Sequence, residues 1–260
     1  MLILQAPSWL KDLVGACFFY TALPVVPWPK PQFNRIARFA PVIGLGLGGI
    51  QSSIWIVLTG RGWSYEASAL LLIAIGIALT GGLHIDGLMD TGDGLAAGKS
   101  KSLEAMRDSR VGSFGSMALI LALLIQISAL IQLQNFVPFA LPIAMFWGRF
   151  APLWAIGNFP YLHIEGNGSF HKKHWRSLRE TFPSLIIIII FLIIILSAPV
   201  TLQAKSSLLV SVPTGLIISI FTSELLGRKL GGQSGDSYGA SVVITETLML
   251  LFLSLYCHEM

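Results

Sequence analysis

The chain has 260 residues, of which 54% are hydrophobic and only 12% are charged, with a formal net charge of +4. Because an average globular domain has about 25% charged residues, this composition excludes an ordinary water-soluble domain. The basic residues lie in short segments between apolar blocks, which favours a role in membrane topology over binding to nucleic acid. We therefore expect an all-α, polytopic integral membrane protein with a single membrane-embedded domain over residues 1–260.

The first predicted helix is a short apolar segment at residues 9–23, which four prolines between positions 24 and 31 terminate. We interpret it as an amphipathic or re-entrant helix, with a full span as the alternative. About seven transmembrane helices are predicted after it, at residues 39–60, 67–83, 113–133, 137–157, 183–200, 207–226 and 240–257. The first of these spans contains four glycines that are expected to allow close helix packing, namely Gly44, Gly46, Gly48 and Gly49.

Basic residues are distributed unevenly between the loops of this arrangement. One set of alternate loops holds 13 Lys and Arg residues, whereas the opposite loops hold only Arg61 and Lys205. The positive-inside rule therefore places the first set in the cytoplasm. We interpret the cations of the 158–180 loop as topology determinants. All the polar segments lie on this predicted cytoplasmic side and are expected to meet at one mouth, namely residues 80–94, 104–115, 158–180 and 231–236.

The stretch TGGLHIDGLMDTGDG, residues 80–94, follows an apolar run and contains three aspartates at helical spacing. If a helix begins at Asp86, the carboxylates of Asp86, Asp90 and Asp93 share one face. Their repulsion is unfavourable unless a cation or protonation relieves it, and oxygen ligands favour Mg²⁺ or Mn²⁺. The alternative for these aspartates is helix capping or ion pairing, and Asp93 before Gly94 could form a simple turn. For His84, a catalytic base and a capping side chain are both open.

A second polar segment, EAMRDSRVGSFG at residues 104–115, precedes the next predicted span. Its arginines, Arg107 and Arg110, could hold phosphate oxygens, and Ser109 could donate a hydrogen bond. Asp108 could contact a metal ion or water. The alternative is that the arginines anchor the helix at the membrane boundary.

Two further features place polar groups near the same mouth. The loop GGQSGD provides Gln233 and Ser234 as hydrogen-bonding groups and Asp236 as a carboxylate, although a tight interhelical turn explains its glycines equally well. Arg149 lies inside an apolar span. Such a position is costly unless the arginine is paired or faces a polar cavity, so we predict a role in the bundle interior or in function.

At these motifs the sequence resembles the cobalamin synthase family, whose members are adenosylcobinamide-GDP ribazoletransferases. The resemblance rests on TGGLHIDGLMDTGDGL, LEAMRDSRVGSFGSMAL and RKLGGQSGDSYGA, and it extends to FYTALPVVPWP, RIARFAPVIG and GRFAP. These segments follow one another in order over nearly the whole chain. The departures from the expected pattern, at Met89, Gly92, Val111 and Ser234, remove no candidate ligand.

The resemblance implies a Mg²⁺-dependent transfer in the cytoplasmic (inner) membrane of a bacterium or archaeon. A ribose hydroxyl of α-ribazole, or of its 5′-phosphate, attacks adenosylcobinamide-GDP and releases GMP, giving adenosylcobalamin or its 5′-phosphate. The active-site segments are residues 80–115 and 228–240, facing the cytoplasm. The implied partners are these substrates and the lipid bilayer, without nucleic acid; homo-oligomer formation and association with other cobalamin-assembly enzymes stay open.

The resemblance also implies roles for individual side chains. The catalytic residues are His84, Asp86 and Asp90. The metal ligands are Asp86, Asp90 and Asp93, with Asp108 and Asp236 as further ligands. The substrate-binding residues are Arg107, Ser109, Arg110, Arg149, Gln233 and Ser234.

Two functions from other classes are the alternatives. A CDP-alcohol phosphotransferase-like lipid enzyme also places several aspartates beside membrane helices, but the Ala-Arg pair expected after its first Asp-Gly is absent from DGLMDTGDG. A divalent-cation transporter could use carboxylates within the membrane. However, the aspartates here gather at one mouth, and the sequence provides no matching polar set for the opposite face.

Overall fold

The structure is a computed structural model that describes residues 6–162, 168–199 and 201–258. Within these residues the regular structure is helical, apart from one isolated parallel bridge between Tyr161 and Gln233. The predicted all-α class is therefore confirmed.

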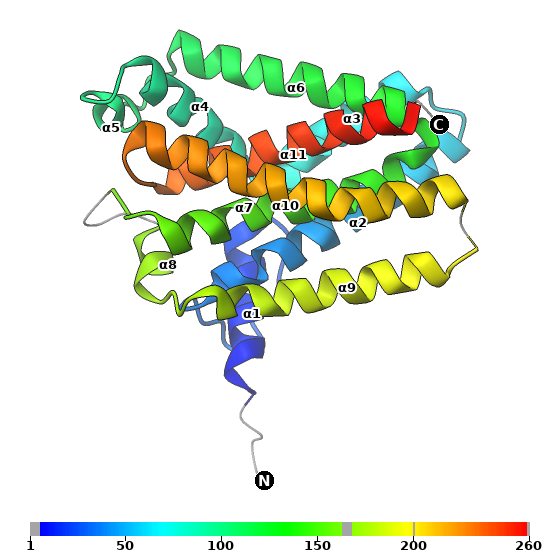
Figure 1. Cartoon of the computed structure of the whole chain (residues 1–260), viewed down its shortest axis with the longest axis horizontal. Helices are drawn as coiled ribbons and strands as arrows, with labels where there is room; N and C mark the ends of the chain where they lie inside the picture. Colours follow the sequence, from blue (N-terminus) through cyan, green and yellow to red (C-terminus); the bar gives the residue numbers. More distant parts are fainter. Residues whose placement is uncertain (1–5, 163–167, 200, 259–260) are drawn as a thin grey trace.

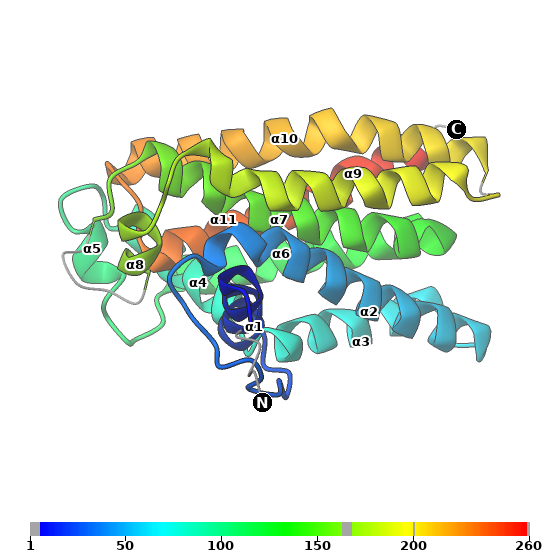
Figure 2. The same ribbon diagram turned by 90° about the horizontal axis from the view of Figure 1, so that it is seen from below.

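The long helices lie side by side along one axis (Figures 1 and 2). The central helix is α7 (Val137–Asn158), which packs most extensively against α2, α11 and α10. The other members of the bundle are α2 (Ala40–Gly60), α6 (Ser113–Leu133), α9 (Phe182–Ser197), α10 (Leu202–Leu230) and α11 (Gly235–His258). Two shorter helices, α3 (Tyr65–Leu79) and α4 (Leu83–Ala96), follow α2 in the chain.

Five helical stretches of the described chain are long and apolar enough to cross a bilayer. A sixth qualifies if α3 and α4 form one span, which is bent by 91° at the break between them. The stretch Ser113–Asn158 contains two antiparallel helices, α6 and α7, separated by the short 3-10 helix η2 (Gln134–Phe136) (Figure 1). The predicted seven spans are reached when α6 and α7 are counted separately and α3 with α4 counts as one. The polytopic helical architecture is confirmed.

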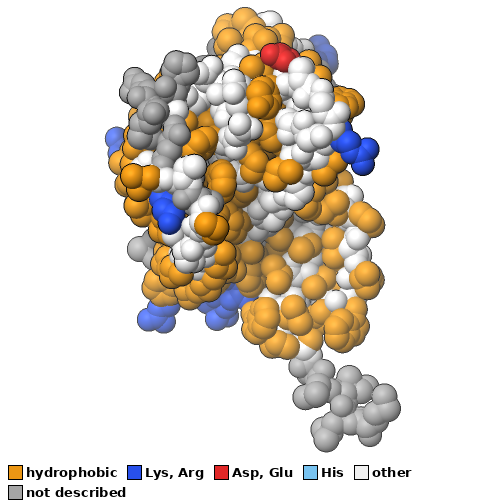
Figure 3. All heavy atoms as spheres, turned by 90° about the vertical axis from the view of Figure 1, so that its right-hand side faces the viewer, with side chains coloured by type: hydrophobic (Ala, Val, Ile, Leu, Met, Phe, Trp, Pro, Cys, Tyr) orange, Lys and Arg blue, Asp and Glu red, His pale blue; other side chains and the backbone are white. Residues whose placement is uncertain are grey.

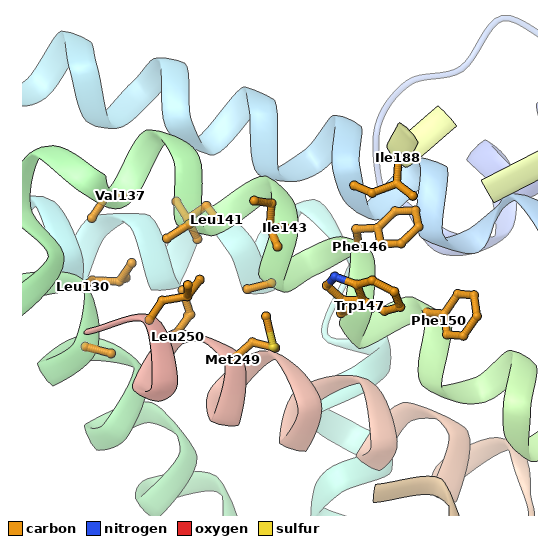
Figure 4. Packing of buried hydrophobic residues seen from close by; sticks show 14 of the residues in the cluster. Leu130, Val137, Leu141, Ile143, Phe146, Trp147, Phe150, Ile188, Met249 and Leu250 are labelled. Atoms are coloured by element: carbon orange, nitrogen blue, oxygen red, sulfur yellow. The ribbon is translucent and has the colours of Figure 1, made fainter. Parts of the chain in front are cut away.

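The bundle core surrounds α7. This helix carries apolar side chains on all sides, and a helix of that kind is buried within the protein. In Figure 4, Phe146 of α7 lies beside Ile188 of α9, and Trp147 lies toward Met249 of α11. Two of the four predicted packing glycines face this core helix. The α-carbon of Gly44 lies against the carbonyl oxygen of Met145, and that of Gly48 lies against Pro142, whereas Gly46 and Gly49 have open space.

Large apolar side chains on the outside of the bundle are exposed, as expected for contact with lipid. On α9 these include Ile186, Ile189, Ile190, Ile193 and Ile194, which are 51–62% exposed. Figure 3 shows hydrophobic side chains over much of one end of the molecule, where acidic side chains are scarce. The exposed isoleucines of α9 would be unfavourable in water and are stable in a bilayer.

The first helix, α1 (Ser8–Tyr20), runs crosswise to the bundle (Figures 1 and 2). With 13 residues it is too short to cross a bilayer. Its inner face packs on the 3-10 helix η1 (Ile36–Phe39), and an ion pair of 2.8 Å joins Asp12 to Arg38. The amphipathic or re-entrant interpretation of this segment is therefore favoured over the full span.

The polar segments gather at one end of the bundle, at the left of Figure 1. This end contains α4, the short helices α5 (Ser102–Ala105) and α8 (Ser169–Lys173), and the turn from α10 to α11. The turn between α2 and α3 lies at the opposite end. The structure thus brings together the segments that were predicted to share one mouth, and we call this end the polar end.

Candidate active site

The carboxylates of the site begin on α4, where the chain changes direction. Gly81 and Gly82 adopt φ values of +59° and +76°, a region that favours glycine. They allow the 91° bend after α3 and let α4 begin at Leu83. The predicted helical spacing is present, because Asp86 and Asp90 both lie within this helix.

A close backbone contact joins α4 to α11. A β-carbon added to Gly87 would lie 2.5 Å from the carbonyl oxygen of Asp236, and one added to Gly239 would lie 3.3 Å from the α-carbon of His84. Only glycine permits this approach without a shift of one helix. The contact places Asp86 of α4 and Asp236 of α11 on the same cavity.

This cavity has a volume of about 190 Å³ and lies between α1, α4, α7 and α11. Part of its wall is polar and part is apolar or aromatic. The polar part contains His84, Asp86, Arg149 and Asp236. The remaining wall includes Phe19, Tyr20, Leu153, Ile156 and His171. A charged group and an apolar group could therefore be bound next to each other.

The acidic residues repel one another across the α4–α11 contact. The negative charges of Asp86, Asp236 and Asp93 all act on Asp90. Among the described residues, no three His, Cys, Asp or Glu side chains are arranged to hold a metal ion by themselves. Mg²⁺, however, is commonly bound by one or two carboxylates together with substrate phosphates and water. The pair Asp86 and Asp236 fits that donor set.

Asp93 has a different environment from the other two aspartates of α4. Its carboxylate oxygens accept hydrogen bonds of 2.8 Å from the backbone N–H groups of Gly112 and Gly115. These groups lie at the N-terminus of α6, where backbone N–H groups have no partner within the helix. The geometry supports the capping alternative for Asp93 and gives no support to its predicted role as a metal ligand.

Arg149 is buried, with 1% of its surface exposed, and is held by a carboxylate within the bundle. Its Nη1 atom lies 2.5 Å from Oε1 of Glu246 and 3.2 Å from the carbonyl oxygen of Met145. The Nε atom has no hydrogen-bond partner among the described residues. Both conditions expected for an arginine inside a span are met, because Arg149 is paired and also lines the cavity.

His84 is buried on α4 and lines the same cavity. The positive charge of Arg149 acts on its ring. A second cavity of about 60 Å³, deeper among the spans, is also lined by His84, Arg149 and Glu246. His84 therefore lies between the polar wall of the larger cavity and the Arg149–Glu246 pair.

Gln233 and Ser234 do not line the cavity, so its geometry gives no support to their predicted role in binding substrate. Both are fully buried. The amide of Gln233 donates to the carbonyl oxygen of Ser223 at 2.9 Å and accepts from Ser237 at 2.6 Å. Ser234 and Ser237 cap each other's backbone N–H groups at the start of α11. Their polar groups stabilise the loop that positions Asp236.

The segment before α6 lies outside the cavity lining, although it belongs to the polar end. The guanidinium of Arg110 donates a hydrogen bond of 2.6 Å to the carboxylate of Asp108. This interaction lowers the pKa of Asp108 to about 2. Arg107, Ser109 and Arg110 are exposed. The geometry therefore gives no support to the predicted metal ligation by Asp108, and it places the three other residues at the surface.

Three residues of the site were missed by sequence reasoning. Glu246 had a detectable signal, because a glutamate inside an apolar span usually has a partner. Tyr20 and His171 had no detectable signal in the sequence. Tyr20 lies in the first apolar segment, and His171 lies among cations that were attributed to topology.

Tyr20 and His171 lie close to each other at the cavity. The Tyr20 hydroxyl lies 3.4 Å from Nε2 of His171. Burial lowers the pKa of His171 to about 3, with a smaller effect from His174, and burial raises the pKa of Tyr20.

Comparison with known proteins identifies the family. A family model described as cobalamin-5-phosphate synthase matches residues 12–254. The chain belongs to this family. A relative from Prochlorococcus marinus (strain MIT 9303), named adenosylcobinamide-GDP ribazoletransferase, is 49% identical over 254 residues, covering 96% of this chain and 98% of the relative. A relative of the same name from Trichormus variabilis is 36% identical over 250 residues, which cover 95% of this chain and 97% of the relative. No solved structure matches the chain.

Membership of the cobalamin-5-phosphate synthase family makes this chain an enzyme, a transferase of cobalamin biosynthesis. The matched region includes every residue that lines the cavity, from Phe19 to Val242. The family match therefore favours a transferase of cobalamin biosynthesis over a lipid phosphotransferase and over a cation transporter.

Proposed function

We propose that this enzyme joins α-ribazole, or its 5′-phosphate, to adenosylcobinamide-GDP in a Mg²⁺-dependent reaction. A ribose hydroxyl attacks the phosphorus on the cobinamide side of the pyrophosphate. The bond from that phosphorus to the bridging oxygen breaks, and GMP leaves with this oxygen. The hydroxyl proton passes to a base or to water. The names of the relatives support these substrates, and the cavity with carboxylates on two helices supports the chemistry.

Asp86 and Asp236 are the proposed metal ligands, because their side chains line one cavity from different helices. When bound, Mg²⁺ would neutralise charge on the pyrophosphate and on the leaving phosphate. Asp90 lies within the field of both carboxylates and is the next candidate, through a bound water or directly. The repulsion among the three aspartates is relieved when a cation binds, which favours metal binding.

Arg149 is the proposed phosphate contact within the cavity. Glu246 fixes its guanidinium, and its Nε donor is free for an anion as far as the described residues are concerned. A buried arginine donates strong, directed hydrogen bonds to phosphate oxygens. His84 lines the same wall and would orient the attacking hydroxyl or accept its proton. Arg107 and Arg110, at the surface of the polar end, would contact the parts of the substrate outside the cavity.

The size of the cavity indicates which part of the substrates enters it. An apolar cavity of about 150 Å³ binds one benzene molecule. A cavity of about 190 Å³ is therefore too small for the corrin ring, which would remain at the surface of the polar end. Positioning of the hydroxyl against the phosphorus is then the main contribution of the protein to catalysis.

The polar end is proposed to face the cytoplasm, in the cytoplasmic membrane of a bacterium or archaeon. The excess of Lys and Arg in the loops at this end supports that orientation. Both substrates are water-soluble phosphorylated or nucleoside compounds, which would reach the cavity from this side.

The direct test uses the purified protein in lipid nanodiscs with both substrates. We expect Mg²⁺-dependent release of GMP together with a cobalamin product, and loss of release when EDTA removes the metal. Two further assays address the alternatives, namely consumption of a CDP-linked lipid and metal flux into proteoliposomes. The proposal fails if either of these activities occurs and GMP is not released.

A further inference from the structure

The cavity has an aromatic part that the metal and phosphate chemistry does not use. It is formed by Phe19 and Tyr20 of α1 and by His171 of α8, and we call these three residues the aromatic subsite. The ring of Phe19 meets that of His171 edge to face at 5.5 Å, and the ring of Tyr20 is nearly parallel to it at 6.2 Å. Leu153 and Ile156 of α7 add apolar surface. The subsite is therefore suited to a planar apolar group.

The subsite contains one polar pair with unused hydrogen-bonding capacity. The Tyr20 hydroxyl lies 3.4 Å from Nε2 of His171, while Nδ1 of the same ring has no partner among the described residues. His171 is buried, with 6% of its surface exposed. A buried ring nitrogen without a partner is unfavourable, so a bound group that supplies one hydrogen bond would relieve this cost.

The two parts of the cavity differ in charge, which determines where each part of the substrates can bind. Asp86, Asp236 and Arg149 line the polar wall, where a metal-bound phosphate is favoured. The aromatic subsite offers no Lys or Arg to a phosphate. Its aromatic side chains suit one heteroaromatic ring system, which stacks favourably on such rings.

The position of the subsite distinguishes the two bases present in the reaction. The base of the attacking nucleoside is separated from the reacting phosphorus by only one ribose. Guanine lies farther away, beyond the second phosphate and a ribose, and it carries several polar groups that would each need a partner. The subsite lies in the same cavity as the proposed metal ligands, so it fits the nearer base.

We propose that the aromatic subsite binds the heteroaromatic base of the attacking nucleoside, and that His171 forms a hydrogen bond with this base. The inference rests on the proposed function, because it takes the reaction of a nucleoside with a pyrophosphate as given. It assigns a binding role to the crosswise helix α1, which contributes two walls of the subsite without crossing the membrane. It also makes His171 a substrate-binding residue in a loop otherwise explained by topology.

The test compares His171→Phe, which keeps a ring and removes both nitrogens, with His171→Asn, which retains a hydrogen-bonding group near the position of Nδ1. His174→Asn is the matched control, because His174 is only half-buried and its Nδ1 bonds to the carbonyl oxygen of Phe170. We expect His171→Phe to raise the KM for α-ribazole at least about fivefold, the effect of one lost hydrogen bond. His171→Asn should recover part of this loss, and His174→Asn should match the wild type.

The KM for adenosylcobinamide-GDP and the Mg²⁺ dependence should stay unchanged in all three variants. Equal increases in both KM values, or a lower kcat with both KM values unchanged, would overturn the inference. Equilibrium dialysis measures the binding of α-ribazole alone, without the reaction, and so tests the aromatic subsite separately from the proposed function. GMP release by the wild type with equal binding by wild type and His171→Phe refutes the subsite only. Weaker binding by His171→Phe, in a protein that releases no GMP, supports the subsite and refutes the reaction.

Discussion

At the scale of single residues, the three aspartates of α4 have the same side chain but different surroundings. Asp86 lines the cavity, Asp90 lies within the field of its acidic neighbours, and Asp93 accepts two backbone hydrogen bonds from the start of α6. Helical spacing alone made all three equivalent candidates for a metal. The partners of each carboxylate separate them into two proposed metal-site residues and one helix cap.

Replacement of Asp93 distinguishes a cap from a metal ligand. The variant Asp93→Asn keeps one acceptor oxygen but presents an N–H group to the other backbone donor. We expect it to lower the free energy of unfolding by about 1 kcal/mol, the typical cost of losing a cap. Thermal unfolding in detergent measures this loss. The Mg²⁺ concentration for half-maximal turnover should remain as in the wild type; a large increase in that concentration with unchanged stability would show that Asp93 is a ligand.

Several residues of the site could be predicted from the sequence, and others could not. Charged groups beside or inside apolar runs, such as Asp86 and Arg149, are conspicuous because burial of a charge is costly. The hydrogen bonds of Gln233 within its own loop could not be predicted, because a polar side chain in a glycine-rich loop looks the same whether it binds a ligand or the loop itself. Tyr20 and His171 were missed, since their meeting depends on the tertiary placement of α1 and α8.

At the scale of elements, the contact between α4 and α11 assembles the site. The backbones approach at Gly87 and Gly239, which places Asp86 and Asp236 on one cavity. The sequence predicted both helical segments, because apolar and polar residues follow recognisable patterns. It did not predict which helices touch, because glycine serves equally in turns, in bends and at helix contacts.

The variant Gly87→Ala tests this contact. The added β-carbon would lie 2.5 Å from the carbonyl oxygen of Asp236, so α4 and α11 must separate. A displacement of about 1 Å at a catalytic site can lower activity about 100-fold, and we expect a loss of that order in GMP release. The control is Gly49→Ala on α2, where the added carbon meets no atom within 4 Å and turnover should be unchanged. Wild-type turnover by Gly87→Ala would show that the close contact is unnecessary.

At the scale of the whole molecule, segments that are far apart in the sequence converge at the polar end. The bundle was predictable from its long uncharged runs, and the all-α class followed from the need to satisfy backbone groups within lipid. The number of spans was harder to predict, because α3 and α4 are joined through a 91° bend and α1 lies crosswise. Bends and crosswise helices have apolar compositions similar to those of true spans.

The proposed orientation predicts which end of the molecule an impermeant thiol reagent reaches. In a background in which Cys17→Ser and Cys257→Ser remove the native thiols, Ser100→Cys marks the polar end and Trp63→Cys marks the α2–α3 turn. In intact cells only Trp63→Cys should be labelled, whereas inverted vesicles should label Ser100→Cys. The reverse pattern, in variants that retain activity, would place the polar end outside the cytoplasm.

The central claim is that Asp86 of α4 and Asp236 of α11 together hold the metal that acts on the pyrophosphate. Both carboxylates line the same cavity, and loss of either removes a negative ligand from the cation. The matched control is Glu66→Gln, because Glu66 is exposed in the first turn of α3 and glutamine can replace it at a helix N-terminus.

The most direct measurement is GMP release as a function of Mg²⁺ concentration in Asp86→Asn, Asp236→Asn and Glu66→Gln. Loss of metal stabilisation worth several kcal/mol predicts a fall in turnover of at least about 100-fold in both aspartate variants. The residual activity should require more Mg²⁺ than the wild type, and Glu66→Gln should behave as the wild type. Wild-type turnover and Mg²⁺ dependence in Asp86→Asn or Asp236→Asn would contradict the proposed metal site.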